Sequence, residues 1–405
     1  MARPGKVYVG VEIGTSKTCV VVGEVKPDTG VRILSIGVTK SAGIRKGELA
    51  DFVQARACLR DALTRAENAS NTEIRAVYLA VTGAHIRGIN SKGVLRLPEN
   101  QQTILPEHVK EVSEIAEDIQ YPEDHVCLHS IPRNYVVDGL ELSSSPVGLF
   151  GKTIEANFHI VHGMGNRIQN SIKLVRECPL EVKEVVFSPI ATAQGVLERE
   201  ERLRGALLID IGGGTTDFVM YLDGAIAACG CIPVGGDHVT NDIHLCTGLT
   251  FSKAEKLKIL EGSASADPSK SVGVAKLADE NGFADVEVKR ATLNLIIRQR
   301  LEETLCLVRD SLPKGSVEAL GAGIFLTGGA SLTNGLYSLA FEVFGRDVYS
   351  SKPCESADLS HPSYEEPQFA AAIGLIRYAQ ILETENRKPP GLIGRLVGMF
   401  WPFRE

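Results

Sequence analysis

The 405-residue sequence predicts an α/β protein made of two related halves, with a small α+β insert and a C-terminal amphipathic helix. Three observations support this. A similar segment occurs twice, at Val7–Ser16 and Leu207–Asp217. Between Gly83 and Gly163 the pattern changes to several strand-like runs around one helical stretch. Residues 391–405 combine bulky apolar and basic residues behind a polar, proline-containing stretch. A chain of this length has room for two or three domains.

Each copy of the repeated segment has the same order of residue types. An apolar run leads to an acid, an isoleucine, glycine and small hydroxyl residues, and a second apolar run follows. Apolar runs on both sides of a glycine turn are typical of two strands joined by a tight connection. The sequence therefore predicts a strand, turn and strand in each half.

We expect the insert to interrupt the first half, and an outer, mostly helical subdomain to interrupt the second. In residue numbers, the expected parts are the first half (1–82 and 164–190, closed by about 368–382), the insert (83–163), the second half (191–235 and 311–367), the outer subdomain (236–310), a linker (383–390) and the terminal helix (391–405).

The composition excludes several classes of protein. Apolar residues make up 44% and charged residues 23%, which is ordinary for globular chains and unlike disordered or fibrous ones. The net charge of −7 argues against nucleic acid as the main partner. Nine scattered cysteines show no zinc or redox spacing and suit a reducing cytosol. No run approaches the roughly 18 apolar residues of a spanning helix, and the N-terminal residues are unlike a signal peptide.

Glycine turns at three places predict a site for a triphosphate. Glycine lets backbone N–H groups approach phosphate oxygens closely, so a chain without excess positive charge can still bind ATP. Neither the P-loop nor the dinucleotide-binding glycine pattern occurs. The expected nucleotide-binding residues in these turns are Gly14, Thr15, Ser16, Lys17, Gly212, Gly213, Gly214, Thr215, Thr216, Gly328, Gly329 and Ala330.

Acidic residues beside the turns predict a magnesium site. Glu12 and Asp210 each end the first strand of a repeated segment, and Asp217 follows the second turn. Carboxylates commonly hold Mg²⁺ together with several waters and the phosphates of a nucleotide. We therefore expect Mg²⁺ here, bound mostly through water.

The order of these three turns resembles the actin, heat-shock chaperone and sugar-kinase superfamily of ATP-binding proteins. The resemblance implies an actin-like two-lobed ATPase fold with the nucleotide in a central cleft. Glu255 and Lys258 match the superfamily's pair that contacts ribose and adenine, although this spacing is also common on ordinary helix surfaces.

Within the superfamily, Val9–Thr15 is similar to the FtsA family of bacterial cell-division proteins because glutamate replaces the usual aspartate at Glu12. Further stretches that match this family are Tyr78–His85, Leu128–Tyr135, Pro146–Gly151 and Ile324–Ala330. The resemblance implies self-association into filaments and binding of the C-terminal peptide of FtsZ on residues 236–310. It also implies contacts with other division proteins through the insert.

One position bears on hydrolysis. Ser188 precedes Pro189 at the start of a helix, where related proteins often carry an acid or amide that places the attacking water. Serine is a poor general base without a partner. We therefore expect ATP binding with weak or no ATPase activity. An alternative is that Ser188 only caps the helix.

The terminal residues predict a membrane contact, and the family resemblance implies that this contact is at the cytoplasmic face, at the division site. On a helical wheel the apolar residues of 391–405 occupy one side and small or basic residues the other, as in helices that lie on anionic lipid. A helix packed back onto the body is the alternative. The expected membrane residues are Leu392, Ile393, Arg395, Leu396, Val397, Met399, Phe400, Trp401 and Phe403.

Two other functions on the same fold remain open. A sugar-kinase-like phosphotransferase would need a sugar pocket with a catalytic aspartate, and it would not need the terminal helix. A pilus-assembly relative shares the body and is disfavoured by the same helix.

Overall fold

The computed structural model describes residues 5–26, 30–277, 286–351, 353, 357–359 and 365–387. The predicted terminal helix and all nine of its expected membrane residues lie outside these ranges. Within them, no helix combines the length and apolar character needed to cross a membrane.

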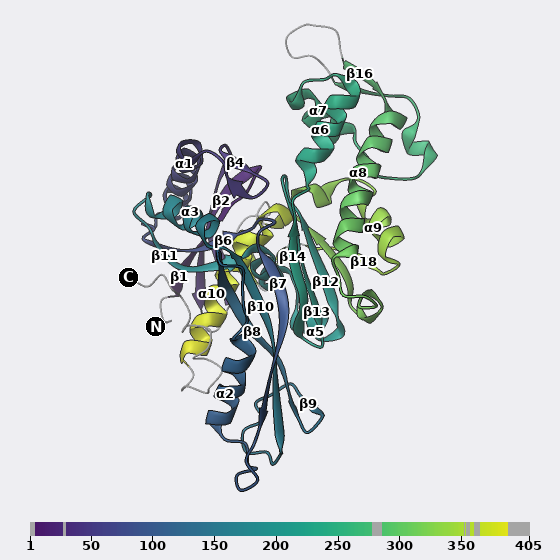
Figure 1. The fold of residues 1–405 in the computed structure, drawn as a ribbon. Helices are drawn as coiled ribbons and strands as arrows, with labels where there is room; N and C mark the ends of the chain where they lie inside the picture. Colours follow the sequence, from purple (N-terminus) through teal and green to yellow (C-terminus); the bar gives the residue numbers. More distant parts are fainter. Residues whose placement is uncertain are drawn as a thin grey trace.

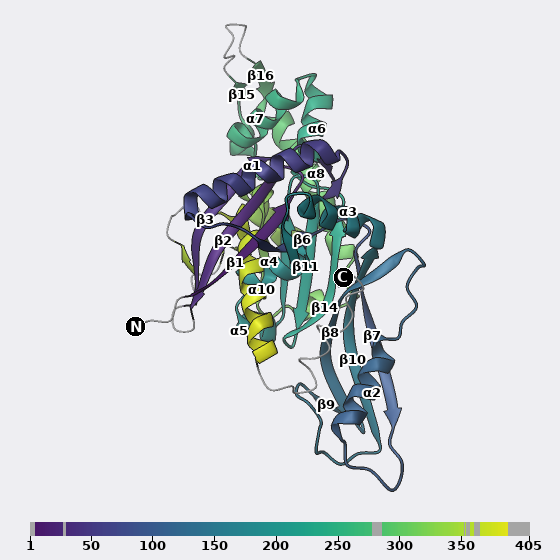
Figure 2. The ribbon, with the colours of Figure 1, turned by 90° about the vertical axis from the view of Figure 1, so that its left-hand side faces the viewer.

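The first half is a six-stranded sheet with helices on both faces, in the order β11-β6-β1-β2-β3-β19. Alternate residues of a strand face opposite sides, so Val9 and Val11 pack with α1 and α3 while Gly10 lies against α10. Figure 2 shows α1 and α10 separated by this sheet. The elements are β1 (Lys6–Ile13), β2 (Lys17–Lys26), β3 (Gly30–Lys40), β6 (Ala76–Val81), β11 (Glu181–Phe187), β19 (Ala357–Leu359), α1 (Phe52–Ser70), α3 (Gly165–Arg176), α4 (Ser188–Val196) and α10 (Ala370–Arg387), with a small hairpin of β4 (Ile44–Arg45) and β5 (Glu48–Leu49).

The second half has its own hydrophobic core, formed where sheet and helices of the outer subdomain pack together. The elements are β12 (Ala206–Ile211), β13 (Thr216–Leu222), β14 (Ala225–Ile232), β17 (Gly323–Thr327), β18 (Val348–Ser350), α5 (Arg199–Arg204), α6 (Gly236–Thr247), α7 (Phe251–Glu261), α8 (Arg290–Asp310) and α9 (Leu336–Phe344). The outer subdomain is mostly helical, as predicted, and carries one hairpin, β15 (Val274–Leu277) and β16 (Val286–Lys289).

The insert is a curved antiparallel sheet with one helix, and it points away from the body at the bottom of Figure 1. In the sequence, the insert lies between two strands of the first half. Its sheet nevertheless continues the sheet of the second half, because Arg87 of the insert pairs with Gly230. Helix α2 lies so close to β7 that a side chain at Gly93 would meet the Val112 carbonyl oxygen at 2.3 Å. The elements are β7 (Arg87–Arg96), α2 (Pro106–Glu117), β8 (His125–Val137), β9 (Leu140–Leu142) and β10 (Thr153–Met164).

One predicted boundary is wrong. The linker was expected to begin at residue 383, but α10 continues through Arg387. The polar residues from Glu383 onward are compatible with a helix, and no proline interrupts them before Pro389. The predicted linker therefore loses residues 383–387 to helix α10. Residues 391–405 are called the tail below.

Candidate nucleotide-binding site

The two repeated segments form the same turn in the two halves. The N–H of Gly14 donates to the carbonyl of Lys17 at 2.9 Å, and the N–H of Gly212 donates to the carbonyl of Thr215 at 2.9 Å. Each turn joins two antiparallel strands, β1 to β2 and β12 to β13. The predicted strand, turn and strand are confirmed in both halves.

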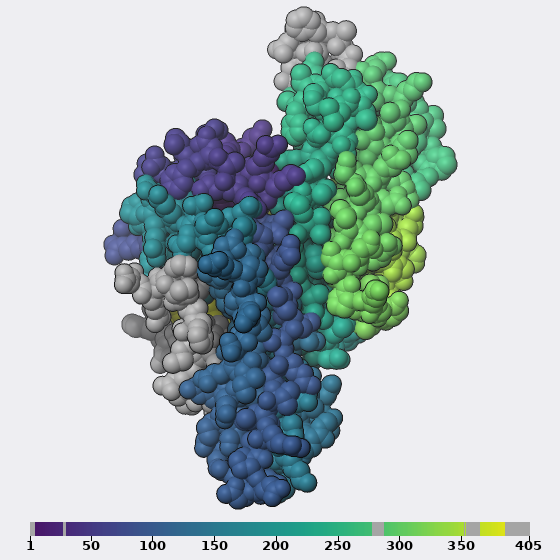
Figure 3. Space-filling model, in the orientation of Figure 1, coloured from purple at the N-terminus to yellow at the C-terminus, as the bar shows by residue number. Residues whose placement is uncertain are grey.

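The two turns face each other. A side-chain carbon at Gly214 would lie 2.4 Å from Thr15 Oγ1, and one at Gly213 would lie 3.0 Å from the Ser16 side chain. Only glycine allows this approach between the halves. The turns border one pocket, which residues of both halves line. Figure 3 shows the surface deeply notched between the N-terminal residues and the outer subdomain.

Most predicted site residues line this pocket, and four do not. The pocket contains Glu12, Gly14, Thr15, Ser16, Lys17, Asp210, Gly212, Gly213, Gly214, Thr215, Asp217, Gly328 and Gly329. Thr216 is fully buried outside it, and its hydroxyl donates to the Val234 carbonyl at 2.8 Å. Thr216 alternates with its neighbours along β13, which explains why its side chain faces another way.

The remaining three predicted residues gather beside the start of α6. Lys258 Nζ lies 2.7 Å from the Glu255 carboxylate and 3.0 Å from the carbonyl of Gly236. The methyl of Ala330 would be 3.6 Å from a side-chain carbon at Gly236, whose own N–H donates to the carbonyl of Gly212 at 2.9 Å. This group therefore borders the second glycine turn without lining the pocket.

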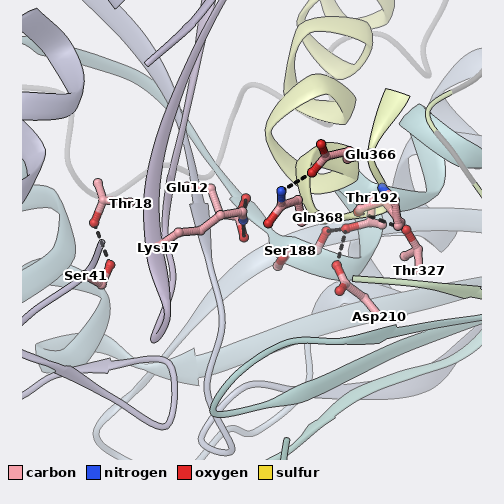
Figure 4. A network of polar contacts seen from close by, with 11 residues as sticks. Glu12, Lys17, Thr18, Ser41, Ser188, Thr192, Asp210, Thr327, Glu366 and Gln368 are labelled. Atoms are coloured by element: carbon pink, nitrogen blue, oxygen red, sulfur yellow. Dashed lines mark hydrogen bonds and ion pairs between the residues drawn. The ribbon is translucent and has the colours of Figure 1, made fainter. Parts of the chain in front are cut away.

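Negative charge is concentrated in the pocket. Burial, with Asp217 and Glu12 nearby, raises the pKa of Asp210 to about 7. Burial also raises the pKa of Asp217 to about 6, although the Thr82 hydroxyl donates to it at 2.6 Å. Figure 4 shows Lys17 against Glu12 and Thr192 beside Asp210. Buried carboxylates that resist ionisation favour a bound cation.

The acids suit a magnesium ion held mostly through water. Among the described residues, no three ligating side chains converge closely enough to hold a metal ion by themselves. A Mg²⁺ ion usually keeps several waters and takes oxygens from phosphates. Glu12, Asp210 and Asp217 line the same pocket as the glycine turns, so they fit an ion that a nucleotide would bring.

Burial is the largest single influence on the pKa of Lys17 and lowers it, but the carboxylate of Glu12, 3.0 Å away, together with Cys19 and Asp210 outweighs burial, so the pKa of Lys17 is raised. Lys17 therefore stays a cation at the edge of the first glycine turn. This is where it would meet a phosphate oxygen.

Ser188 lines the pocket, but it does not cap α4. The capping position is Phe187, and Ser188 is the first helical residue. Its carbonyl accepts a hydrogen bond from the Thr192 hydroxyl at 3.0 Å, and the same hydroxyl lies 3.3 Å from Asp210 Oδ2 (Figure 4). The capping alternative is therefore wrong, and Ser188 faces the site.

Among the glycine and polar residues of the pocket, three escaped the sequence analysis: Gly47, Thr82 and Gln368. The apolar residues Ile13, Ala80 and Val81 also line it. The N–H of Gly47 donates to Thr15 Oγ1 at 3.0 Å. Thr82 and Gly83 follow the apolar strand β6, in the same order as Thr327 and Gly328 of the third predicted turn, so this signal was available. Gln368 lies in a short 3₁₀ turn far along the chain, and nothing local marks it.

The two halves, the facing glycine turns and the pocket between them define an actin-like protein. Solved structures of this fold agree. The chain aligns with the PilM–PilN type IV pilus biogenesis complex (TM-score 0.63, 19% identity, 92% of this chain and 98% of that one). It also aligns with MreB5 of Spiroplasma citri bound to ADP (TM-score 0.56, 13% identity, 95% of this chain and 99% of that one). At these identities the likeness shows the fold alone.

The chain belongs to the FtsA family of cell-division proteins. It is 32% identical to cell division protein FtsA of Pseudomonas aeruginosa over 93% of this chain and 90% of that protein. It is 33% identical to FtsA of Escherichia coli K12, over 94% and 91%. The family model for cell division protein FtsA matches residues 207–374, and that for the SHS2 domain inserted in FtsA matches residues 83–162. The predicted actin-like fold with its insert is confirmed.

Proposed function

We propose that this protein binds ATP with Mg²⁺ between its two halves and links the FtsZ ring to the cytoplasmic face of the membrane at the division site. The observation that carries the nucleotide part is the pair of identical glycine turns that face each other across one acidic pocket. Membership of the FtsA family supports the cell-division part.

The chain's own groups have distinct tasks toward ATP. The N–H groups of the two glycine turns cradle phosphate oxygens, and Lys17 adds one positive charge. Glu12, Asp210 and Asp217 would orient the waters of a Mg²⁺ ion. The ion would neutralise part of the negative charge of the phosphates. Solved MreB5 structures with ADP and with AMPPNP hold nucleotides on this same fold, which supports the assignment.

Asp210→Ala tests the metal part of this proposal. Loss of the carboxylate is expected to abolish binding of Mg-ATP, measured by calorimetry, while vesicle binding stays intact. Glu318→Ala is a matched control because Glu318 lies in a short turn far from the pocket. Retained ATP affinity in the Asp210 variant would refute the role of Asp210.

Hydrolysis is expected to be weak or absent. Ser188 occupies the start of α4 at the pocket, and a hydroxyl without a base does not activate water efficiently. Phosphate release by the full chain should stay near background with Mg-ATP present. Robust turnover, particularly turnover that depends on an added sugar, would favour the phosphotransferase alternative instead.

The membrane part depends on the tail. Its apolar and aromatic side chains suit the boundary of a bilayer, and its arginines suit anionic headgroups. The full chain is expected to co-sediment with anionic vesicles, and a chain ending at residue 390 is expected to stay in the supernatant. Equal sedimentation of both chains would contradict the anchor.

Exposed apolar residues support the proposed protein partners. Leu245, Ile259 and Leu260 are each at least 67% exposed on the outer subdomain, which supports docking of the FtsZ C-terminal peptide there. We assign filament formation to the whole body and other division proteins to the insert. Ile259→Glu should weaken co-sedimentation with FtsZ at least about tenfold if this residue is a central contact. An unchanged affinity would place the docking surface elsewhere.

A further inference from the structure

A second and larger groove, of about 850 Å³, lies outside the nucleotide pocket. Three parts of the chain form its walls: α2 and β8 of the insert, α4 and α5 with the β13–β14 turn, and the last turns of α10. The groove therefore lies where the insert joins the body. Figure 1 shows α10 running toward this junction.

The groove suits an amphipathic occupant. Its apolar lining includes Leu203 and Ile381, which are 49% and 40% exposed, in addition to Leu382. Two buried polar atoms in its lining, Glu117 Oε2 and Arg133 Nε, have no hydrogen-bond partner among the described residues.

The lining carries more acids than bases. Its acids are Glu114, Glu117, Asp118, Glu184 and Asp223, and its bases are Arg133, Arg199 and Arg202. The guanidinium of Arg202 is already bound to the side-chain oxygen of Gln194 at 3.0 Å and to the carbonyl of Leu197 at 2.8 Å. A basic segment with an apolar side would therefore complement the groove.

The chain itself delivers such a segment at this place. Tyr378, Ile381 and Leu382 line the groove, and α10 ends at Arg387, about 8 Å beyond Leu382 at 1.5 Å per residue. Arg387 and Lys388 begin the connection to the tail, which carries Arg395 and Arg404 among its apolar residues. Helix α10 thus ends beside the groove, and the sequence that follows it carries the charge and apolar residues that the groove matches.

We propose that the tail docks in this groove when no membrane is present, so that the groove and the lipid surface compete for it. Docking would bury the apolar side of the tail and place its arginines against the acidic rim at Glu114 and Glu117. This inference rests on the proposed membrane contact, because it concerns the position of the tail when the tail is not bound to lipid. Exposure of the tail would then depend on the groove.

A single tryptophan makes the proposal measurable. Trp401 is the only tryptophan in the chain and lies in the tail, so its fluorescence reports the tail alone. In the full chain without vesicles, we expect blue-shifted emission and acrylamide quenching several-fold weaker than that of a synthetic peptide of residues 388–405. Glu114→Lys should restore peptide-like quenching and lower the lipid concentration for half-maximal vesicle binding about fivefold.

Glu111→Lys is the matched control. Glu111 lies one turn earlier on α2, is exposed and does not line the groove, so the same charge change there should leave quenching unchanged. Leu203→Glu is a second groove variant, which tests the apolar contact at a side chain that tolerates solvent. It should expose Trp401 as Glu114→Lys does.

Two outcomes would overturn the proposal, and a third separates it from the membrane anchor. Peptide-like quenching of Trp401 in the full chain without vesicles would show that the tail does not dock in the groove, even if vesicles still bind. Shielding that disappears on dilution would place the tail in a second copy. Shielding that persists without any vesicle binding would support docking and refute the membrane anchor, so the two proposals fail separately.

Discussion

Glu12 and Asp210 occupy the same position in the two repeated segments, but their neighbours differ. Glu12 has Lys17 at 3.0 Å, which supplies a positive charge within the first half. Asp210 stands opposite a second acid, Asp217, across the β12–β13 pair. The second half therefore has the greater need for a cation, and the first half already carries one. This difference supports the proposed roles, in which the metal lies mainly at Asp210 and Lys17 contacts phosphate.

Buried His129 makes the fold sensitive to acid. Burial lowers the pKa of His129 to about 4, and its Nε2 accepts the N–H of Phe187 at 3.0 Å. The unfolded chain binds the proton near pH 6.5, so stability is complete above that pH and is lost as the pH falls toward 4. His129→Gln keeps an acceptor without titrating.

The variant should therefore flatten the dependence of the unfolding free energy on pH between 6.5 and 4 by up to about 3 kcal/mol. Urea unfolding at several pH values measures this. An unchanged slope would show that His129 does not control the effect. Burial also lowers the pKa of His85 and of His159 to about 4, so the variant should retain part of the dependence.

At the scale of elements, α4 and α10 cross with almost no space between their backbones. A side-chain carbon at Gly374 would lie 1.9 Å from the Ala191 carbonyl, and one at Gly195 would lie 2.8 Å from the Ala370 carbonyl. Because α10 closes the first half and also ends at the groove, this crossing sets the position of both.

Gly374→Ala should lower the free energy of unfolding by about 1–3 kcal/mol, because forced separation of packed helices outweighs the gain in helix propensity of about 1 kcal/mol. Chemical denaturation is the measurement. Gln380→Ala, also in α10 and half-buried, should change stability much less. A stabilised Gly374 variant would contradict the close crossing.

At the scale of the whole molecule, the hydrogen bond between Thr82 and Asp217 joins the two halves beside the pocket. The Thr82 hydroxyl follows β6 of the first half and donates to Asp217 of β13 at 2.6 Å. Asp217 is 4% exposed, so its carboxylate depends on such a donor. This bond links the position of the halves to the charge state of the site.

Thr82→Val keeps the side-chain shape and removes the donor. It should lower the free energy of unfolding by about 1–3 kcal/mol, measured by denaturation, since it removes a donor to a buried carboxylate and leaves the weaker Cys231 thiol as a donor. Thr82→Ser should recover most of the loss. If serine and valine behaved alike, shape at residue 82 would matter and the hydrogen bond would not.

Local patterns predicted much of this molecule because they involve short stretches of chain. Gly14 and Gly212 each stand between two apolar runs, which is enough to predict a turn between strands. Arg87 could not be placed in this way. It belongs to a segment inserted in the first half but pairs with Gly230 of the second, and no local pattern encodes a contact 143 residues away.

The sequence alone determined the repeated turns, the acids beside them and the insert, because each is marked by residue order along the chain. The amphipathic tail stays a prediction from the sequence. Only the tertiary structure decided which groups meet. It turned Thr216 away from the pocket, brought Gly47, Thr82 and Gln368 into it, and set the end of α10 beside an acidic groove. The physical reason is that burial and hydrogen bonding act between residues that are neighbours in space, and folding chooses those neighbours.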